Sequence, residues 1–455
     1  MSTIEQFGYR QELQRSLGFA DLMIYGLIFM VPIAPFGIFG TVFAISGGMV
    51  ALAYVIGLVA MAFTALSYAQ MARAFPMAGS VYTYAGRGIA APVGFMAGWA
   101  ILLDYLLVPT LLYLVASTAM NSFLPAVPVW AWLIAFVLLN TIVNYLGIQM
   151  TARITRIMLA AELVVLAIFL VVGAIALAQG RATAGALTPL YDSSSFSWTL
   201  VLGAASVAVL SFLGFDGIST LAEENREDAR RLGRSMVAAL ALAAVLFVVQ
   251  TWVAALLVPD RAALLAPDAS LDNAFYDTAT YAGGPWLGVL SAVATAIAWG
   301  FANSLVAQAA TSRLLFAMAR DRQLPSFLAR VHRKHRVPVN ATFAVALVSL
   351  ALGVGLSFYA DAIGLLSSMV NFGAMTAFLL LHIAVVVHYV VRQRSRNWLA
   401  HLVLPVIGFA VLVLVVINAS VAAQVLGFIW LGVGLIVAIV LSALGRRPAM
   451  PSEVS

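Results

Sequence analysis

Apolar stretches of about 20 residues recur along the chain, and polar connections separate them. A helix needs roughly 20 apolar residues to cross the hydrocarbon core of a bilayer, so each stretch predicts a membrane-spanning helix. No polar connection is long enough to form a separate soluble domain. The pattern predicts an all-α integral membrane protein with twelve transmembrane helices, near residues 20–43, 49–72, 88–114, 128–147, 154–178, 198–222, 235–258, 286–319, 339–358, 362–390, 399–421 and 424–445.

Two of these spans are interrupted near their centres. The first reads "DLMIYGLIFMVPIAPFGIFG" and contains Pro32 and Pro35, and the sixth reads "SVAVLSFLGFDGISTLAEEN" and contains Gly214, Asp216 and Gly217. A glycine inside a helix costs about 1 kcal/mol relative to alanine. A charge at the bilayer centre costs roughly 2.5–3.5 kcal/mol. The combination therefore needs a reason.

The position of the two breaks indicates what they do. Hydrocarbon cannot satisfy the peptide groups that an unwound turn frees, so these groups must line a protein cavity or bind a ligand. The breaks lie five spans apart, which is the spacing of the broken helices in inverted repeats of transporters. The alternative interpretation is a pair of kinks that pack against neighbouring helices.

Charged residues are few and unevenly distributed. The chain is 63% hydrophobic and 9% charged, with a formal net charge of +6. If the N-terminus is cytoplasmic, every basic residue except Arg181 and Arg261 falls on the cytoplasmic side, as the positive-inside rule requires. We therefore expect a multi-pass protein of the cytoplasmic (inner) membrane with both termini cytoplasmic, in contact with membrane lipid and with no nucleic-acid partner. The first twenty residues lack a cleavable signal pattern, and the chain has no cysteine for a disulfide.

Three carboxylates fall well inside predicted spans: Asp104, Glu162 and Asp216. The predicted spans contain no lysine or arginine at comparable depth. Three acids without basic partners cannot all be buried in the ionised form, so some must be protonated, hydrated or paired with a substrate cation. All three are candidates for proton coupling, and the balance favours a cationic amine over an anion. A purely structural role through hydrogen bonds is the alternative for each, and for Asp216 that role is a cap on the second half of the broken helix.

Uncharged residues near the breaks are further candidates. Phe212 and Phe215 flank the break in span six, where a ring attracts an ammonium group or covers the substrate as a gate; ordinary packing is the alternative. Small polar side chains in spans eight and ten suit either helix–helix hydrogen bonds or substrate contact. They are Asn303 and Ser304, close to Trp299, and Ser367, Ser368 and Asn371.

Glu223 and Glu224 stand at the predicted cytoplasmic end of span six. We expect them to pair with Arg226, Arg230 or the basic run 330–336 as part of an inner gate; a solvated helix end is the alternative. The run 330–336 itself is expected to contact anionic lipid. The five histidines show no metal-ligand spacing, and no Gly-Lys-Ser/Thr phosphate motif is present, so we expect no metal, no cofactor and no ATP-driven pump.

Four segments carry a family resemblance. They are "FPMAGSVYTYAGRGI" (75–89), "GFMAGWAILLDYLLVP" (94–109), "SFLGFDGISTLAEENRED" (211–228) and "ATSRLLFAMARDRQLPSFLARVHRKHRVPVNA" (310–341). In this order they resemble the signature segments of the amino acid–polyamine–organocation (APC) superfamily of permeases. Within it, "LLDYL" and "FLGFD…LAEE" most resemble the bacterial putrescine importers.

The resemblance implies a leucine-transporter-like 5+5 inverted repeat with broken helices one and six and two further helices. On this chain it implies a cytoplasmic tail at 1–18 and a first five-helix repeat at 19–197. The second repeat covers 198–390, and 391–455 holds the last two helices and a cytoplasmic tail.

The resemblance also implies secondary active transport of an amine-bearing solute by alternating access. Substrate is expected between the breaks at 34–37 and 212–216, with spans three and eight as walls. Of Asp104 and Tyr105, about 100° apart on one helix, the tyrosine is expected to face the substrate path and the aspartate to bond to a neighbouring helix. The expected substrate contacts are Ala34, Phe36, Gly37, Tyr105, Phe212, Gly214, Phe215, Asp216 and Asn303.

Two departures from the family pattern bear on substrate and coupling. The segment "PIAPFGIFG" lacks the Gly-x-Gly run whose amides surround a substrate carboxylate, which favours an amine without one. Residues 30–40 also lack the acidic side chain that putrescine importers tend to have, which points the other way. Glu162 falls near the lysine that replaces a sodium ion in several proton-coupled members.

The sequence thus predicts a proton-coupled importer of a putrescine-like diamine or an amino acid, driven by the proton gradient, with sodium coupling left open. An exchanger is the first alternative, and a non-transporting amine sensor on a transporter fold is the second. A membrane-embedded enzyme is disfavoured, because no nucleophile–base pair or metal constellation is apparent.

Overall fold

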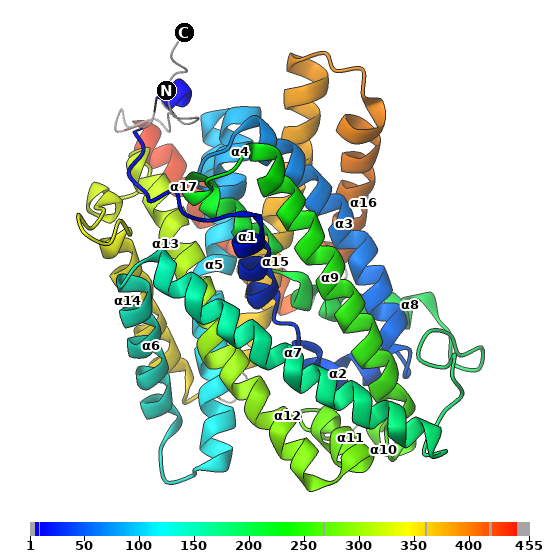
Figure 1. Cartoon of the computed structure of the whole chain (residues 1–455). Helices are drawn as coiled ribbons and strands as arrows, with labels where there is room; N and C mark the ends of the chain where they lie inside the picture. The colour runs from blue at the N-terminus through cyan, green and yellow to red at the C-terminus, as the bar shows by residue number, and fades with distance from the viewer. Residues whose placement is uncertain (1–4, 9, 267–268, 360–361, 418–420, 444–455) are drawn as a thin grey trace.

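The computed structural model describes residues 5–8, 10–266, 269–359, 362–417 and 421–443. Figure 1 shows long helices packed side by side as a bundle. The first half of the chain forms η1 (Glu5–Phe7), α1 (Phe19–Met30), α2 (Pro35–Ile45), α3 (Val50–Ala74), α4 (Ser80–Gly88), α5 (Ala91–Phe123), α6 (Val129–Tyr145) and α7 (Ile148–Ala178).

The second half of the chain continues the bundle. It contains α-helices together with shorter 3₁₀ and π-helical segments. They are α8 (Trp198–Ala208), η2 (Val209–Phe212), η3 (Phe215–Glu224), α9 (Ala229–Leu256), α10 (Arg261–Leu264), α11 (Ala274–Gly283), α12 (Pro285–Ile297), η4 (Ala298–Asn303), α13 (Ser304–Arg320), η5 (Ser326–Ala329), α14 (Val339–Leu356), α15 (Ala362–Val385), η6 (Val386–Arg392), η7 (Leu399–Val403), α16 (Leu404–Ile417) and α17 (Val421–Ala443).

The predicted all-α membrane fold is confirmed. Among the described residues, ten helices are long and apolar enough to cross a membrane, and the bent pair α1 and α2 makes an eleventh. The fourth predicted span, near residues 128–147, corresponds to α6, a shorter apolar helix of 17 residues. The predicted cytoplasmic C-terminal tail, from residue 444 onward, lies outside the described residues.

The first span is broken where the sequence predicted. Its two halves meet at an angle of 52° across residues 31–34. Pro32 and Pro35 lack the N–H that would continue the helix, and Val31 has a φ of 56°, in the left-handed region that interrupts a helix. Pro35 then occupies the first turn of α2, where its fixed φ is compatible with a new helix.

The sixth span is irregular without a sharp bend. It leaves the helical conformation at Leu213 and Gly214, where Gly214 has a φ of 116°, and resumes as the 3₁₀ helix η3. A Cβ atom on Gly214 would lie 2.8 Å from Cγ of Phe29, the penultimate residue of α1. The glycine therefore allows both the backbone conformation and the close approach of the two interrupted spans.

A third irregularity was not predicted. The eighth span contains a π-helical turn, η4, between α12 and α13. Such turns inside α-helices are frequent at functional sites because they re-aim the side chains that they carry. Trp299 and Asn303 both lie on this turn.

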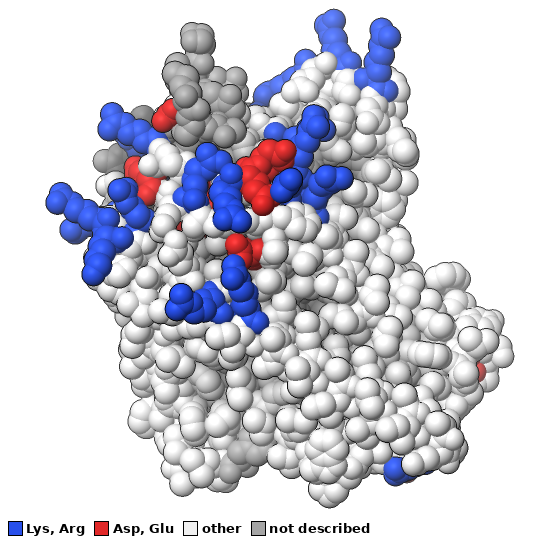
Figure 2. All heavy atoms as spheres, in the orientation of Figure 1, with Lys and Arg blue, Asp and Glu red and all other residues white. Residues whose placement is uncertain are grey.

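Basic residues gather at one end of the bundle, as Figure 2 shows for the face in view. We call this the basic end; it is formed by residues 73–90, 222–234, 320–338 and 386–398. A short segment before α1 crosses it, since the N–H groups of Ser16 and Leu17 donate to the Glu224 carbonyl and the N–H of Arg226 donates to the Leu17 carbonyl. The proposed boundaries between the two five-helix repeats stay predictions.

Candidate substrate cavity

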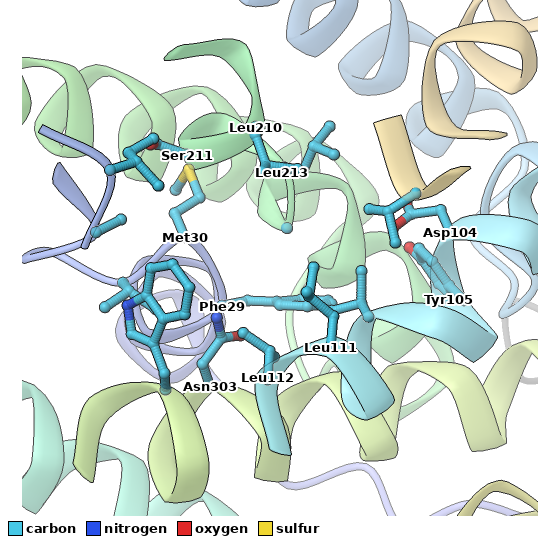
Figure 3. Close-up of a pocket in the computed structure, with 17 residues that line it drawn as sticks. Phe29, Met30, Asp104, Tyr105, Leu111, Leu112, Leu210, Ser211, Leu213 and Asn303 are labelled. Atoms are coloured by element: carbon cyan, nitrogen blue, oxygen red, sulfur yellow. The ribbon is translucent and has the colours of Figure 1, made fainter. Parts of the chain in front are cut away.

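A cavity of about 70 Å³ lies where the two interrupted spans meet. By this measure it has room for roughly five water molecules, at about 15 Å³ each. Figure 3 shows side chains from several elements pointing into it. The cavity is lined by Phe29, Met30, Val31, Ala34 and Ile38 of the first span, Asp104, Tyr105, Val108, Leu111 and Leu112 of α5, Leu210, Ser211, Leu213 and Gly214 of the sixth span, Trp299 and Asn303 of η4, and Val370 of α15.

The cavity is mostly apolar, with a few convergent polar groups. Among the described residues that line it there is no lysine or arginine, and Asp104 supplies the only carboxyl group. Two buried polar atoms, Nε1 of Trp299 and Oδ1 of Asn303, have no hydrogen-bond partner in the described part of the chain. The rings of Phe29 and Tyr105, with centroids 6.4 Å apart, form an aromatic wall. Such a site suits a small cation, because a carboxyl group and ring faces both attract an ammonium group.

Asp216 lies behind this wall and joins α5 to the broken span. Its Oδ2 accepts a hydrogen bond of 2.6 Å from the Tyr105 hydroxyl, and its Oδ1 accepts one of 3.2 Å from the Gly214 N–H. The expected acceptance of hydrogen bonds from freed amides is thus observed at Gly214. Asp216 is buried and is not itself a lining residue. It reaches the cavity through Tyr105.

The expectation for Asp104 was wrong. We expected it to turn toward a neighbouring helix, but it lines the cavity beside Tyr105. The two side chains are about 100° apart on α5, yet both line the cavity. Figure 3 shows them next to each other at one end of the cavity.

Peptide N–H groups at the two breaks are largely occupied by the chain itself. In the first span the N–H groups of Val31, Ala34, Phe36 and Gly37 donate to the carbonyls of Ile28, Val31, Ile33 and Ala34. In the sixth span the N–H of Leu213 donates to the Leu210 carbonyl, and that of Gly214 donates to Asp216. Few amides therefore remain to surround a substrate carboxylate, as the missing Gly-x-Gly run predicted.

Several predicted contact residues do not line the cavity. Phe36 stacks on Phe275, with ring centroids 3.8 Å apart. Phe212 packs edge-on against Phe247, and Phe215 against Tyr68. A Cβ atom on Gly37 would lie 3.0 Å from the Trp299 ring, so this glycine makes room for a lining residue. In this conformation these residues shape the walls from behind, and direct substrate contact by them stays a prediction.

Glu162 is buried on α7, on the same face as Leu159, Leu166 and Phe169. It is not among the residues that line the cavity. Neither of its carboxyl oxygens has a hydrogen-bond partner within the described residues. An ionised carboxylate in this position is unfavourable, so the site favours a protonated group or a bound cation.

Glu223 and Glu224 form ion pairs, but the predicted partners were wrong. Glu224 receives two hydrogen bonds from Arg313, of 2.7 and 2.9 Å. Glu223 receives two from Arg320, of 2.8 and 3.0 Å, and one of 3.1 Å from the Ala78 N–H. Both arginines lie on α13, which packs against η3, whereas we expected arginines nearer in sequence or the run 330–336. Arg313 is thus a buried basic residue, whereas the sequence predicted no lysine or arginine at the depth of the buried carboxylates.

Sequence reasoning also missed part of the lining. Phe29, Met30 and Ser211 carried no local signal, because apolar and small hydroxyl residues are ordinary in spans. Ser304, one of the candidates, instead accepts a 2.7 Å hydrogen bond from Asn140 of α6, which is helix packing. Asn371 likewise donates to the Ser206 carbonyl.

A bundle of membrane-spanning helices around a cavity with a few convergent polar groups, at two interrupted spans, defines a membrane transporter of small solutes. Comparison with known proteins agrees with this class. A family model described as "Amino acid permease" matches residues 20–444, and the chain belongs to this family.

Individual relatives transport different solutes. The chain is 30% identical to the low-affinity putrescine importer PlaP of Escherichia coli over 98% of this chain and 97% of the relative. It is 27% identical to the branched-chain amino acid permease BcaP of Bacillus subtilis over 94% and 93%. It is 29% identical to the vacuolar cationic amino acid transporter 4 of Arabidopsis thaliana over 83% and 63%. The chain is therefore a multi-pass transporter of amino acids or amines.

Proposed function

We propose that this protein imports a small amine, with a putrescine-like diamine favoured over an amino acid, across the cytoplasmic membrane by proton-coupled alternating access. The observation that carries the proposal is the composition of the cavity. It presents the Asp104 carboxyl group, the aromatic wall and the unpartnered Asn303 oxygen, without a basic lining residue. The similarity to the putrescine importer supports the same substrate class.

The choice of a diamine rests on the peptide groups at the breaks. An α-amino acid brings a carboxylate that needs N–H donors, and the N–H groups of Val31, Ala34 and Gly214 are already bonded. An ammonium group needs acceptors instead, and Asp104 and Asn303 supply them. The site therefore favours an amine without a carboxylate.

Proton coupling rests on the buried carboxyl groups. No described residue forms a hydrogen bond with either carboxyl oxygen of Glu162, and Asp104 faces the cavity that substrate would enter. A proton neutralises such a group when no cation is present, and its release returns the charge. Exchange of protons at Glu162, Asp104 or Asp216 would couple uptake to the proton gradient.

Uptake into proteoliposomes tests this function. Purified full-length protein would be supplied with labelled putrescine, leucine or arginine, with an inside-alkaline pH gradient, with a sodium gradient, or with neither. We expect concentrative putrescine uptake only with the pH gradient. Uptake that requires amine inside the vesicles would identify an exchanger. Binding without uptake would identify a sensor. Either result would overturn the proposal.

Variants at Asp104 connect that result to the cavity. Asp104→Asn removes the charge at nearly constant shape and is expected to reduce putrescine uptake by tenfold or more, since a buried charge-assisted hydrogen bond contributes about 1.5–3 kcal/mol. Asp104→Glu keeps the charge and should retain part of the activity. Asp192→Asn is the matched control, because Asp192 lies in an exposed loop and bonds to Ser194.

A further inference from the structure

A second pocket, of about 450 Å³, lies at the basic end, away from the substrate cavity. The end of α3 and the connection between the tenth and eleventh spans, with parts of η6 and η7, supply most of its lining, and Phe7 of η1 also lines it. Its lining residues are Phe7, Gln70, Arg73, Ala74, Phe75, His388, Tyr389, Gln393, Ser395 and His401.

Arg73 is the charged group of this pocket. It lies in the last turn of α3, its side chain is exposed, and no carboxylate in the described part of the chain forms an ion pair with it. A guanidinium group presents several N–H donors in a planar fork that matches the oxygens of a phosphate group. The unpaired fork therefore offers an anchor for an anion.

Neighbouring polar side chains are held in place by bonds among themselves. His401 Nδ1 lies 2.7 Å from Oγ of Ser395, and its ring stacks on Tyr389 at 4.0 Å with an interplanar angle of 13°. The Tyr389 hydroxyl donates to the Gln70 carbonyl at 2.9 Å. The Gln393 amide lies 2.9 Å from Nε2 of His388. These contacts fix two imidazole rings and one amide around the pocket, which lowers the cost of ordering them on binding.

The segments that form the pocket carry positive charge. No aspartate or glutamate among the described residues lines the pocket, and residues 70–75 and 386–403 contain none. The connection carries the further arginines Arg392, Arg394 and Arg396. Glu5 stands two residues before Phe7 but is not a lining residue. An anion would therefore meet attraction without repulsion from the wall.

The segment 386–403, which supplies five of the lining residues, has the character of a membrane interface. Trp398 and Leu399 are 55% and 63% exposed, and Val391 is 65% exposed. Exposed tryptophan beside apolar residues is typical of the level of lipid head groups, and basic pockets between membrane helices bind phosphate-bearing head groups. We propose that this pocket binds a phosphate group, presented by an anionic lipid head group or by a soluble phosphate compound.

Lipid binding to the purified full-length protein tests the proposal. Native mass spectrometry would count bound phosphatidylglycerol and phosphatidylcholine of identical acyl chains, for the unchanged protein and for Arg73→Gln, and inorganic phosphate would be added as a competitor. We expect preferential phosphatidylglycerol binding that Arg73→Gln weakens by about tenfold or more, the loss expected for one charge-assisted hydrogen bond. Arg230→Gln is the matched control, because Arg230 is an exposed arginine at the same end, on α9.

A second variant keeps the test decisive if Arg73→Gln is not recovered in folded form. His401→Gln keeps a polar side chain of similar reach and should also weaken phosphatidylglycerol binding, by less than Arg73→Gln. Competition by phosphate without a lipid preference would assign the pocket to a soluble phosphate compound. Equal binding of both lipids without phosphate competition, or equal losses in Arg73→Gln and Arg230→Gln, would overturn the proposal.

Discussion

The hydrogen bond from Tyr105 to Asp216 connects the wall of the candidate substrate cavity to the interruption in the sixth span. Tyr105 lines the cavity, and Asp216 accepts from the peptide N–H of Gly214 on the other side. A substrate that moves the tyrosine would therefore alter the support of the interrupted segment. The Tyr105 hydroxyl and the Asp216 carboxyl group thus link the cavity wall to the backbone of the sixth span.

Removal of the Tyr105 hydroxyl tests this link. Tyr105→Phe keeps the ring and deletes a hydrogen bond to a carboxyl group, a contact that contributes about 1.5–3 kcal/mol when the acceptor is charged. We expect the apparent substrate affinity to fall about tenfold, measured as KM for uptake. Tyr145→Phe is the control, because its hydroxyl contacts His332 away from the cavity. An unchanged KM would remove Tyr105 from the site.

Neutral variants of the buried acids separate coupling from transport. Glu162→Gln and Asp216→Asn cannot release a proton, so we expect each to abolish uptake against a gradient while the protein still inserts in the membrane. For Glu162→Gln, which alters no described hydrogen bond, exchange of labelled amine down its gradient should persist. Normal uphill uptake by both variants would contradict the coupling model.

Some residues of the site could be found from sequence and others could not. Asp104, Glu162 and Asp216 were identified because a carboxyl group in an apolar span is costly and therefore conspicuous. Ser211 and Phe29 were missed because nothing distinguishes them locally from packing residues. Their role depends on the neighbouring span that they face.

At the scale of elements, Gly214 determines how closely the first and sixth spans approach. Its φ of 116° is unfavourable for any residue with a Cβ atom, and that atom would meet Phe29 at 2.8 Å. Alternatives to glycine must therefore move α1, η3 or both. Glycine is therefore required at position 214 both for the backbone conformation and for the packing of the two spans.

The substitution Gly214→Ala measures this requirement. We expect a loss of about 2 kcal/mol or more, from the left-handed backbone and the clash with Phe29, together with strongly reduced uptake. Thermal unfolding in detergent and proteoliposome uptake report the two effects. Gly355→Ala in α14 is the control, because a Cβ atom there meets nothing within 4 Å, and it should leave both unchanged or raise stability slightly. Equal behaviour of the two variants would contradict the argument.

The positions of the spans and of the first break could be predicted from sequence, but the position of the π-helical turn could not. Hydropathy alone located the spans, since membrane insertion depends on the summed transfer free energy of about 20 neighbouring residues. Proline chemistry located the break between α1 and α2. The π-helical turn η4 had no such signal, because "AWGFAN" is compatible with a regular helix. Packing against the rest of the bundle selects the wider turn there.

At the scale of the whole molecule, buried ion pairs join distant segments at the basic end. Glu224 and Arg313 have 0% and 3% of their side chains exposed and lie 89 residues apart. The loss of one partner leaves the other charged and buried, which is more costly than the absence of both. These pairs join the sixth span to the eighth at this end.

Glu224→Gln tests the prediction that these ion pairs form an inner gate. We expect the protein to lose about 3–5 kcal/mol of stability, or to open more readily at the basic end. Thermal unfolding and reagent access to that end measure the two outcomes. Glu227→Gln is the control: its pair with Arg231 is exposed, and glutamine keeps an acceptor for the Phe19 N–H, so unfolding should not change. A stable, closed Glu224→Gln variant would argue against a gate here.

The orientation of the bundle is a separate whole-molecule prediction. The chain contains no cysteine, so single introduced cysteines are specific labels. With the basic end cytoplasmic, a membrane-impermeant maleimide should label Ser193→Cys in intact cells and should label Ser326→Cys only after lysis. Both serines are exposed. The reverse labelling pattern would show the opposite orientation.

The sequence by itself determined the class of fold, the order and approximate position of the spans, the break in the first span, and the acids that are costly in a membrane. Each of these follows from transfer free energies or backbone preferences of neighbouring residues. Tertiary structure alone decided that Asp104 faces the cavity, that Glu224 pairs with Arg313, and that Phe212 packs behind the wall. Such pairings join residues far apart in sequence, and their energies depend on which helix faces come together.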